Sequence, residues 1–399
     1  MAKNISVDSR HGIDCKSQKW GFGFPVALVA LASVVLLYIG GNLLFKYALI
    51  TLIFVAILFN VILNVNSPLR LDFSSGKKRL SLLLLFAALL GFMASTLHSL
   101  VLRDLLVQDY GVFFVQAILP LFLIITSNRR LFIEYIGRVC VLFALIDALL
   151  NLLAVLGYID ISMSGRLVGD EVRLRYTGLS GNSHAAGFVA FVASLYLTFK
   201  AHQLRRWIGL IGLLVGMLLV SLYFIDARRY MVFSVVGIMV LLGWKYSSRI
   251  GLVWLMSALS VLFLGATFLT AEMELGNALR AALLLKGLED ASKSSILGSG
   301  PMYLDLSMVE PVEEELIGAG VTESQLLDLA KSYGIAATLL FLSAVLLALS
   351  RRRHTLHPYE LTLITLLTSE LFFGGAIRGV LGSLLFFACL LVSLERKLQ

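Results

Sequence analysis

Apolar runs of about 20 residues recur along the whole chain and constrain its fold more than any other feature. A run of this length crosses the hydrocarbon core of a bilayer as an α-helix, since lipid offers no hydrogen-bond partner to an open backbone. Strands of a membrane barrel would instead alternate apolar and polar residues. Charged residues make up 15% of the chain, against about 25% in soluble domains. The sequence therefore predicts an all-α polytopic membrane protein, with residues 1–399 in a single transmembrane domain.

Twelve transmembrane helices are predicted from these runs. Their approximate ranges are 21–40, 43–64, 80–100, 111–127, 137–157, 185–200, 207–225, 230–244, 250–270, 325–349, 361–376 and 379–394. The sixth run is short, and the last two form either two spans or one re-entrant unit. The first run is too long for a signal-peptide core and has no convincing cleavage site, so it is predicted to stay in the membrane.

Basic residues gather in every second connecting segment, which predicts the orientation. The segments 1–20, 65–79, 128–138, 200–206, 245–249, 350–360 and 395–399 hold 21 of the 33 Lys and Arg residues but 6 of the 25 Asp and Glu residues. Because cytoplasmic loops carry the excess of Lys and Arg, both termini are predicted to be cytoplasmic. The net charge of +8 is then a consequence of topology and does not indicate a nucleic-acid partner.

Two loops on the opposite, periplasmic side are long, at about 158–185 and 271–324. The second starts with apolar residues at helical spacing over 272–290, which predicts an amphipathic helix on the outer membrane surface. The three cysteines lie far apart, so neither a disulfide framework nor a cysteine metal site is expected. No compact cluster of His, Cys or carboxylate residues predicts a metal site of another kind.

Arginine is disfavoured outside the cytoplasm, so each outer arginine is a candidate for function. The arginines in this position are Arg103, Arg166, Arg173, Arg175, Arg228, Arg229, Arg280 and Arg378. Those in the first long loop and in the short turns 226–230 and 374–379 are predicted to reach the same outer level. A guanidinium there matches the oxygens of a phosphate. Alternatively, these arginines pair with Asp226, Glu370 or lipid headgroups.

The sequence Arg175-Tyr-Thr-Gly-Leu-Ser-Gly-Asn182 resembles the Arg-x-x-Gly-x-x-x-Asn signature of the bacterial O-antigen polymerase and ligase superfamily. Three further features resemble that family in the same order. They are the pair Arg228 and Arg229 after the next span, the element Gly298-Ser-Gly300 in the second long loop, and the pair Gly334-Ile335 in the tenth span. The resemblance covers about residues 170–345, and the first half of the chain is similar in hydropathy only.

The resemblance implies a glycosyltransferase in the bacterial inner membrane, with no cofactor or metal and with its active site facing the periplasm. A polymerase of this family transfers the growing glycan from undecaprenyl pyrophosphate to a lipid-linked repeat unit, with inversion. A ligase transfers it to lipid A core. Arginines stabilise the pyrophosphate leaving group, and a general base activates the acceptor hydroxyl. The implied partners are undecaprenyl-pyrophosphate-linked oligosaccharides, membrane lipids, a chain-length regulator and a flippase.

Ligases of the family carry a His at the mouth of the late span, where this chain has Glu323, and this difference favours a polymerase. Glu323 is the predicted general base, with Asp328 or the glutamates in 310–315 as substitutes. Alternatively, Glu323 caps the helix that follows it. Arg175 and Arg228 are the other predicted catalytic residues. The residues predicted to bind pyrophosphate or glycan are Arg173, Arg229, Arg378, Asn182, His184 and Arg280.

Three polar or small-residue features have a second interpretation. His184 is otherwise an interfacial histidine without a substrate contact. Asp147 and Asn151 lie one turn apart in the fifth run, where they form either a contact between helices or part of a proton pathway. A proton pathway would fit a secondary transporter or a flippase for lipid-linked glycan, the alternative from another class. The glycines at 178, 181 and 187 permit either close helix packing or a loop folded back toward the membrane.

Overall fold

The structure is a computed structural model that describes most of the chain. The described ranges are 23–38, 43–63, 76–102, 107–126, 128–159, 163–168, 171–176, 179, 183–204, 207–225, 227–243, 249–270, 275–294, 296–301, 324–350, 356–374 and 379–395. Helices account for nearly all of these residues. This agrees with the prediction of a helical fold and with the need of a lipid-embedded backbone for internal hydrogen bonds.

Fifteen α-helices follow one another in the described ranges. They are α1 (Gly23–Tyr38), α2 (Leu43–Leu63), α3 (Gly76–Leu102), α4 (Val107–Phe113), α5 (Leu119–Ile125), α6 (Arg129–Val155), α7 (Ser183–Gln203), α8 (Ile208–Phe224), α9 (Arg228–Leu242), α10 (Arg249–Leu269), α11 (Leu275–Lys293), α12 (Gln325–Tyr333), α13 (Ile335–Leu349), α14 (Pro358–Phe373) and α15 (Val380–Ser393). A π-helical turn, η2 (Phe114–Ile118), joins α4 to α5. Two strands, β1 (Met163–Val168) and β2 (Glu171–Tyr176), stand between α6 and α7.

Four helical segments of the described chain are long and apolar enough to cross a membrane. They are Phe45–Ile62, Gly76–Val101, Arg129–Val155 and Ser183–Ala201, and six further apolar helices are shorter. The surface of α3 has the matching character, because Leu83, Leu90 and Leu97 repeat every seven residues and are all exposed. An apolar stripe of this size is unusual on a soluble monomer. These features are consistent with a membrane protein, while the count of twelve spans stays a prediction.

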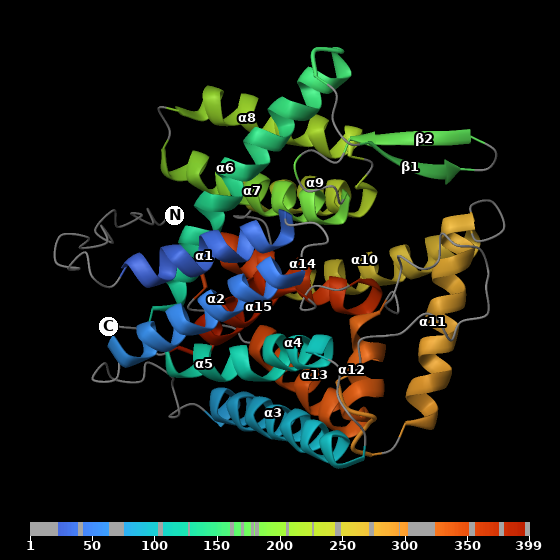
Figure 1. Cartoon of the computed structure of the whole chain (residues 1–399). Coiled ribbons are helices and arrows are strands. Elements are labelled where there is room, and N and C mark those ends of the chain that lie inside the picture. Colours follow the sequence, from blue (N-terminus) through green and yellow to red (C-terminus); the bar gives the residue numbers. More distant parts are fainter. Residues whose placement is uncertain are drawn as a thin grey trace, which may run out of the picture.

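Two elements lie at one end of the helical bundle. Helices α3, α5 and α10 run in roughly the same direction, whereas α11 runs across them, and the β1–β2 hairpin lies at the same end (Figure 1). α11 packs on α10 and α12 and also contacts β1. The segments predicted to form the two long outer loops therefore meet at one end of the bundle.

The predicted tenth span, 325–349, is two helices rather than one. Helix α12 ends at Gly334, whose φ of +86° is left-handed, and α13 begins at the next residue. The segment 296–301 packs into this break, where the Ser299 N–H donates to the Lys331 carbonyl at 3.0 Å and the Gly300 N–H to the Ser332 carbonyl at 2.7 Å. A Cβ on Gly334 would overlap the Ile296 carbonyl. Glycine is required at the break, because it alone combines this φ with so close an approach.

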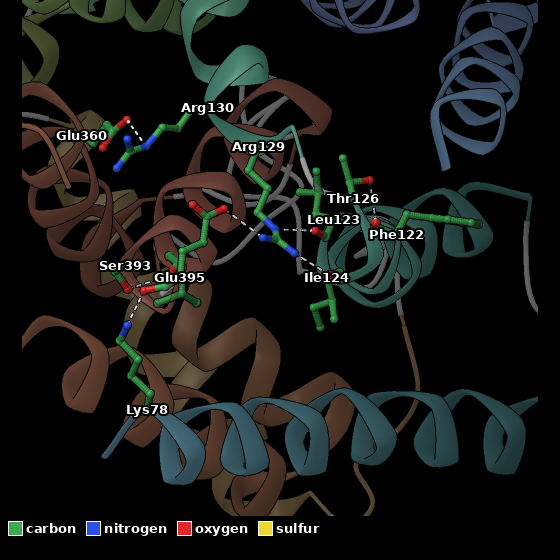
Figure 2. Close-up of polar contacts among 11 residues, drawn as sticks. Lys78, Phe122, Leu123, Ile124, Thr126, Arg129, Arg130, Glu360, Ser393 and Glu395 are labelled. Atoms are coloured by element: carbon green, nitrogen blue, oxygen red, sulfur yellow. Dashed lines mark hydrogen bonds and ion pairs between the residues drawn. The ribbon is translucent and has the colours of Figure 1, made fainter. Parts of the chain in front are cut away.

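A buried arginine holds several segments together at the end of the bundle away from the hairpin. Arg129, the first residue of α6, is 1% exposed, and its Nη1 lies 2.9 Å from Glu395 Oε1. Its guanidinium also donates to the carbonyls of Leu123, at 2.7 Å, and Ile124 at the end of α5 (Figure 2). Lys78 of α3 donates to the backbone carbonyl of Glu395. The cluster therefore ties α3, α5 and α6 to the chain that follows α15.

Replacing Arg129 by Ala is expected to lower the free energy of unfolding by about 3–5 kcal/mol, because it leaves a carboxylate and two carbonyls buried without their donor. The neighbouring Arg130 is a matched control, since its side chain is 44% exposed and its Nε lies 3.7 Å from Glu360. Arg130→Ala should cost less than Arg129→Ala, because Glu360 keeps its hydrogen bond from the His357 N–H at 2.8 Å. Thermal unfolding of the purified variants measures both, and equal losses would contradict this description of the cluster.

Candidate functional site

Four helix ends meet around residues that the sequence analysis selected. They are the starts of α7, α9 and α12 and the end of α14, and we call their contact the helix-end junction. Its members are Gly187, Ala227, Arg229, Tyr230, Gln325, Glu370 and Gly374. The junction joins segments that lie up to nearly 190 residues apart in the chain.

The starts of α7 and α9 touch at Gly187. A Cβ on this residue would lie 2.6 Å from the Cβ of Ala227 and 2.8 Å from Cδ2 of Tyr230. No larger residue fits without displacing α9, so Gly187 serves close helix packing, one of its two predicted roles. Glycines 178 and 181 lie outside the described residues.

A buried carboxylate on α14 holds the start of α9. The Tyr230 hydroxyl donates to Glu370 Oε1 at 2.8 Å, and Arg229 Nε lies 4.0 Å from the same oxygen. A Cβ on Gly374 would lie 2.5 Å from Arg229 Nη1, so the guanidinium runs along the end of α14. A buried carboxylate needs such partners. The pairing of Arg229 with Glu370 is the alternative that the sequence analysis named for the outer arginines.

Helix α12 starts against the same point. The Gln325 N–H donates to the Gly374 carbonyl at 2.9 Å, and Ser324 and Gln325 are both buried. The N-cap residue of α12 is Ser324, so Glu323 stands one position before the cap. Glu323 and Arg378 themselves lie outside the described residues. The described residues closest to them in sequence do lie in the junction. Ser324 directly follows Glu323, and Gly374 lies four residues before Arg378.

The β1–β2 hairpin carries two more of the predicted site residues in the first long loop. The strands are antiparallel, with Arg166 opposite Arg173 and Ser164 opposite Arg175. Because a strand alternates its faces, positions 166, 173 and 175 belong to one face of the hairpin. Hydropathy did not predict these strands. The alternation of apolar and charged residues in Val172-Arg-Leu-Arg-Tyr176 is the signal that could have found them.

Asp147 of α6 binds Leu179, the residue of the motif segment 175–182 that the structure describes between β2 and α7. The Leu179 N–H donates to Asp147 Oδ1 at 2.9 Å, and the Tyr38 hydroxyl donates to Oδ2 at 2.6 Å. One turn further along α6, Asn151 Nδ2 donates to Ser221 Oγ at 3.4 Å. Both residues make contacts between segments, so this one of the two predicted alternatives is confirmed. Within the described part of the motif segment, Leu179 thus lies against α6.

The other predicted site residues differ in where they lie, and one of them is outside the described residues. His184, in the first turn of α7, and Arg228, the first residue of α9, are exposed. Arg280 belongs to α11, the helix that contacts β1, and Asn182 lies outside the described residues. The structure thus separates the two arginines of the turn after α8. Arg229 faces Glu370, and Arg228 is the one exposed at the helix start.

Helix α11 connects this end of the bundle to the broken helix. Lys331 Nζ of α12 lies 2.8 Å from Asp290 Oδ2 of α11, and Ser294 Oγ donates to the Ala330 carbonyl at 3.3 Å. On the exposed side of α11, Lys293 donates to Glu289, and this hydrogen bond lowers the pKa of the Glu289 carboxyl. The exposed side of α11 therefore combines an ion pair with the exposed leucines Leu285 and Leu288, and α11 is anchored to α12 by charge pairing.

Within the described ranges, no group of three or more His, Cys, Asp or Glu residues is arranged to hold a metal ion. In comparisons with known proteins, the chain matches no family model, no curated protein and no solved structure. Among the described residues, the junction combines an exposed arginine at the start of α9 with a buried carboxylate, Glu370, that binds Tyr230.

Proposed function

We propose that this chain is a polysaccharide polymerase that makes O-antigen or a related glycan. It transfers the growing glycan from undecaprenyl pyrophosphate to a lipid-linked repeat unit, with inversion and without a metal. In this proposal it crosses the bacterial inner membrane twelve times, with both termini in the cytoplasm. The segments 158–185 and 271–324 then face the periplasm, together with the helix-end junction.

One observation carries the proposal: the described parts of the motif segments form a continuous set of contacts. The start of α7 touches α9, α9 touches the end of α14, and α14 touches the start of α12. At its other end, α12 stops at Gly334, where the segment with Gly298 and Gly300 is hydrogen-bonded. The starts of α7, α9 and α12 and the end of α14 are thus neighbours, as a shared site requires.

The chemistry assigns a role to each group. The carboxylate of Glu323 takes the proton of the acceptor hydroxyl, whose oxygen attacks the anomeric carbon of the donor glycan. The bond from that carbon to the pyrophosphate oxygen breaks, and undecaprenyl pyrophosphate leaves with the electron pair. Arg175 and Arg228 stabilise the charge that develops on the leaving group. A single in-line displacement of this kind inverts the configuration at the anomeric carbon.

The remaining residues bind the substrates. Arg173, on the strand paired with β1, and Arg280, on α11, which contacts β1, together with Arg378 contact the pyrophosphate. His184 and Asn182, at the start of α7, hydrogen-bond the glycan. Arg229 is bound to Glu370 in this structure, so its proposed part is to hold the end of α14, and with it Arg378, in place.

Deletion of the gene in its bacterium tests the function. Electrophoresis of lipopolysaccharide should then show lipid A core capped by one repeat unit, and restoring the gene should restore the ladder of longer products. Long polymer retained on the carrier lipid would instead indicate a ligase. Absence of any outer-face glycan would indicate a flippase. Either of these two outcomes contradicts the proposal.

Replacing Asp147 by Ala is expected to lower the transfer rate by about 100-fold, because the motif segment loses the acceptor that fixes Leu179 and small displacements of a site are costly. The Tyr38 hydroxyl and the Leu179 N–H, in two part-buried hydrogen bonds, lose their acceptor. This costs at most about 1–3 kcal/mol of stability. Asn151→Ala is the matched control, since Asn151 bonds Ser221 and not the motif segment. It should lose stability but keep its rate. Equal rates in the two purified variants would exclude a positioning role for Asp147.

A further inference from the structure

A hollow opens between α6, α7 and α8 near the end of the bundle that holds Arg129. Its volume is about 510 Å³, and its walls include Glu134 and Arg138 of α6, Tyr196 and Lys200 of α7, and Trp207 and Leu210 around the start of α8. We call it the α6–α8 hollow. It lies far along α6 and α7 from Asp147 and Ser183, so it is separate from the helix-end junction.

In the hollow, the carboxylate of Glu134 binds two cationic side chains at once. Glu134 Oε1 accepts from the Tyr196 hydroxyl at 2.7 Å, from Lys200 Nζ at 3.0 Å and from Arg138 Nη2 at 3.0 Å. Arg138 is 59% exposed and Lys200 is 24% exposed. Lys200 Nζ also sits 5.3 Å from the centre of the Tyr196 ring. The hollow therefore carries one positive charge in excess, on side chains held in place by their neighbours.

The remaining wall is apolar and exposed. Trp207 is 57% exposed, and Leu204 and Leu210 are exposed to a similar extent. Exposed apolar side chains beside a Trp are typical of the boundary between headgroups and acyl chains. The two residues between Leu204 and Trp207 in the sequence are both arginine, which adds to the basic character of this segment.

We propose that the α6–α8 hollow binds the headgroup of an anionic phospholipid. The lipid phosphate is held by Lys200 and Arg138, and an acyl chain lies along Leu204, Trp207 and Leu210. Charge complementarity supports this occupant, since basic pockets between membrane helices bind anionic headgroups. The apolar wall distinguishes a lipid from a free phosphate, which would leave these side chains uncovered. The proposal is independent of the glycan reaction at the other end of the bundle.

Titration of the purified full-length protein in neutral detergent with phosphatidylglycerol or phosphatidylcholine tests the site. Native mass spectrometry should show preferential retention of phosphatidylglycerol. At about 100-fold excess over its dissociation constant, this lipid should raise Tm by about 3 °C or more. The double variant Arg138→Gln, Lys200→Gln should bind it about 25-fold more weakly, at about fivefold per cation. Lys293→Gln is the matched control, because it removes a cation from an ion pair four residues apart on α11.

Three results would overturn the proposal. They are equal binding of the two lipids, unchanged phosphatidylglycerol binding in the double variant, and an equal rise in Tm with inorganic phosphate at the same concentration. The last would indicate a site for free phosphate. If the double variant does not fold, Arg138→Gln alone decides, because that side chain is mostly exposed. It should bind phosphatidylglycerol about fivefold more weakly, and unchanged binding would reject the site.

Discussion

Replacing Glu323 by Gln is expected to slow glycan transfer by about 10²–10⁴-fold, the range that general-base catalysis contributes. Gln keeps the size of the side chain but cannot take the proton of the acceptor hydroxyl. The substitution should leave the fold intact, because Ser324 rather than Glu323 is the N-cap residue of α12. Loss of one charge beside a helix start costs only about 0.3–1 kcal/mol. The initial rate of repeat-unit addition by the purified variant measures the effect.

Asp328→Asn is the control for this experiment. Asp328 lies in the first turn of α12, so its replacement removes the same charge near the same helix start. It should retain most of the transfer rate. If Asp328→Asn were the slow variant and Glu323→Gln the fast one, the base would be Asp328 and the assignment of Glu323 would be wrong.

Replacing Gly334 by Ala is expected to lower the free energy of unfolding by about 3–5 kcal/mol, as much as the loss of Arg129. The φ of +86° disfavours any residue with a Cβ, and the added methyl group would overlap the Ile296 carbonyl. A backbone atom cannot turn aside as a flexible side chain can. The segment 296–301 would therefore have to leave the helix break, with loss of the hydrogen bonds from Ser299 and Gly300 to α12.

Gly212→Ala, within α8, is the matched substitution. A Cβ there would meet no other atom within 4 Å, so alanine should stabilise the helix by up to about 1 kcal/mol through its higher helix propensity. Thermal unfolding of both variants in one detergent provides the comparison. If the Gly334→Ala variant had the same Tm as the Gly212→Ala variant, the helix break would not depend on glycine.

The helices were predictable because a backbone in lipid must form its hydrogen bonds internally, and an α-helix does so within one segment. The break in the tenth run was not predicted, although the polar residues of 325–333 give way to a uniformly apolar run directly after Gly334. The close packing of Gly334 with the distant segment 296–301, which fixes the break, is a tertiary contact. The hairpin was missed because hydropathy averages over the alternation of charged and apolar residues in β2. These two features depend on short patterns and tertiary contacts that a hydropathy window does not contain.

The candidate site was predictable to a lesser degree. The positive-inside rule identified the outer arginines as candidates, and Glu370 was predicted as an alternative partner for them. The structure pairs Glu370 with Arg229. The spacing of Asp147 and Asn151 indicated a polar contact but not its partners, because Tyr38 lies 109 residues away in the sequence. The separation of Arg228 from Arg229 needed the structure, since adjacent residues at a helix start point in different directions.

The most direct test of the central claim uses the purified full-length protein in vesicles. The only glycan supplied is the repeat unit linked to undecaprenyl pyrophosphate, and a chelator removes divalent metal ions. The proposal predicts carrier-linked glycans of two or more repeats, with one undecaprenyl pyrophosphate released for each new glycosidic bond. No extension under these conditions, or glycan transfer only after addition of lipid A core, would contradict it.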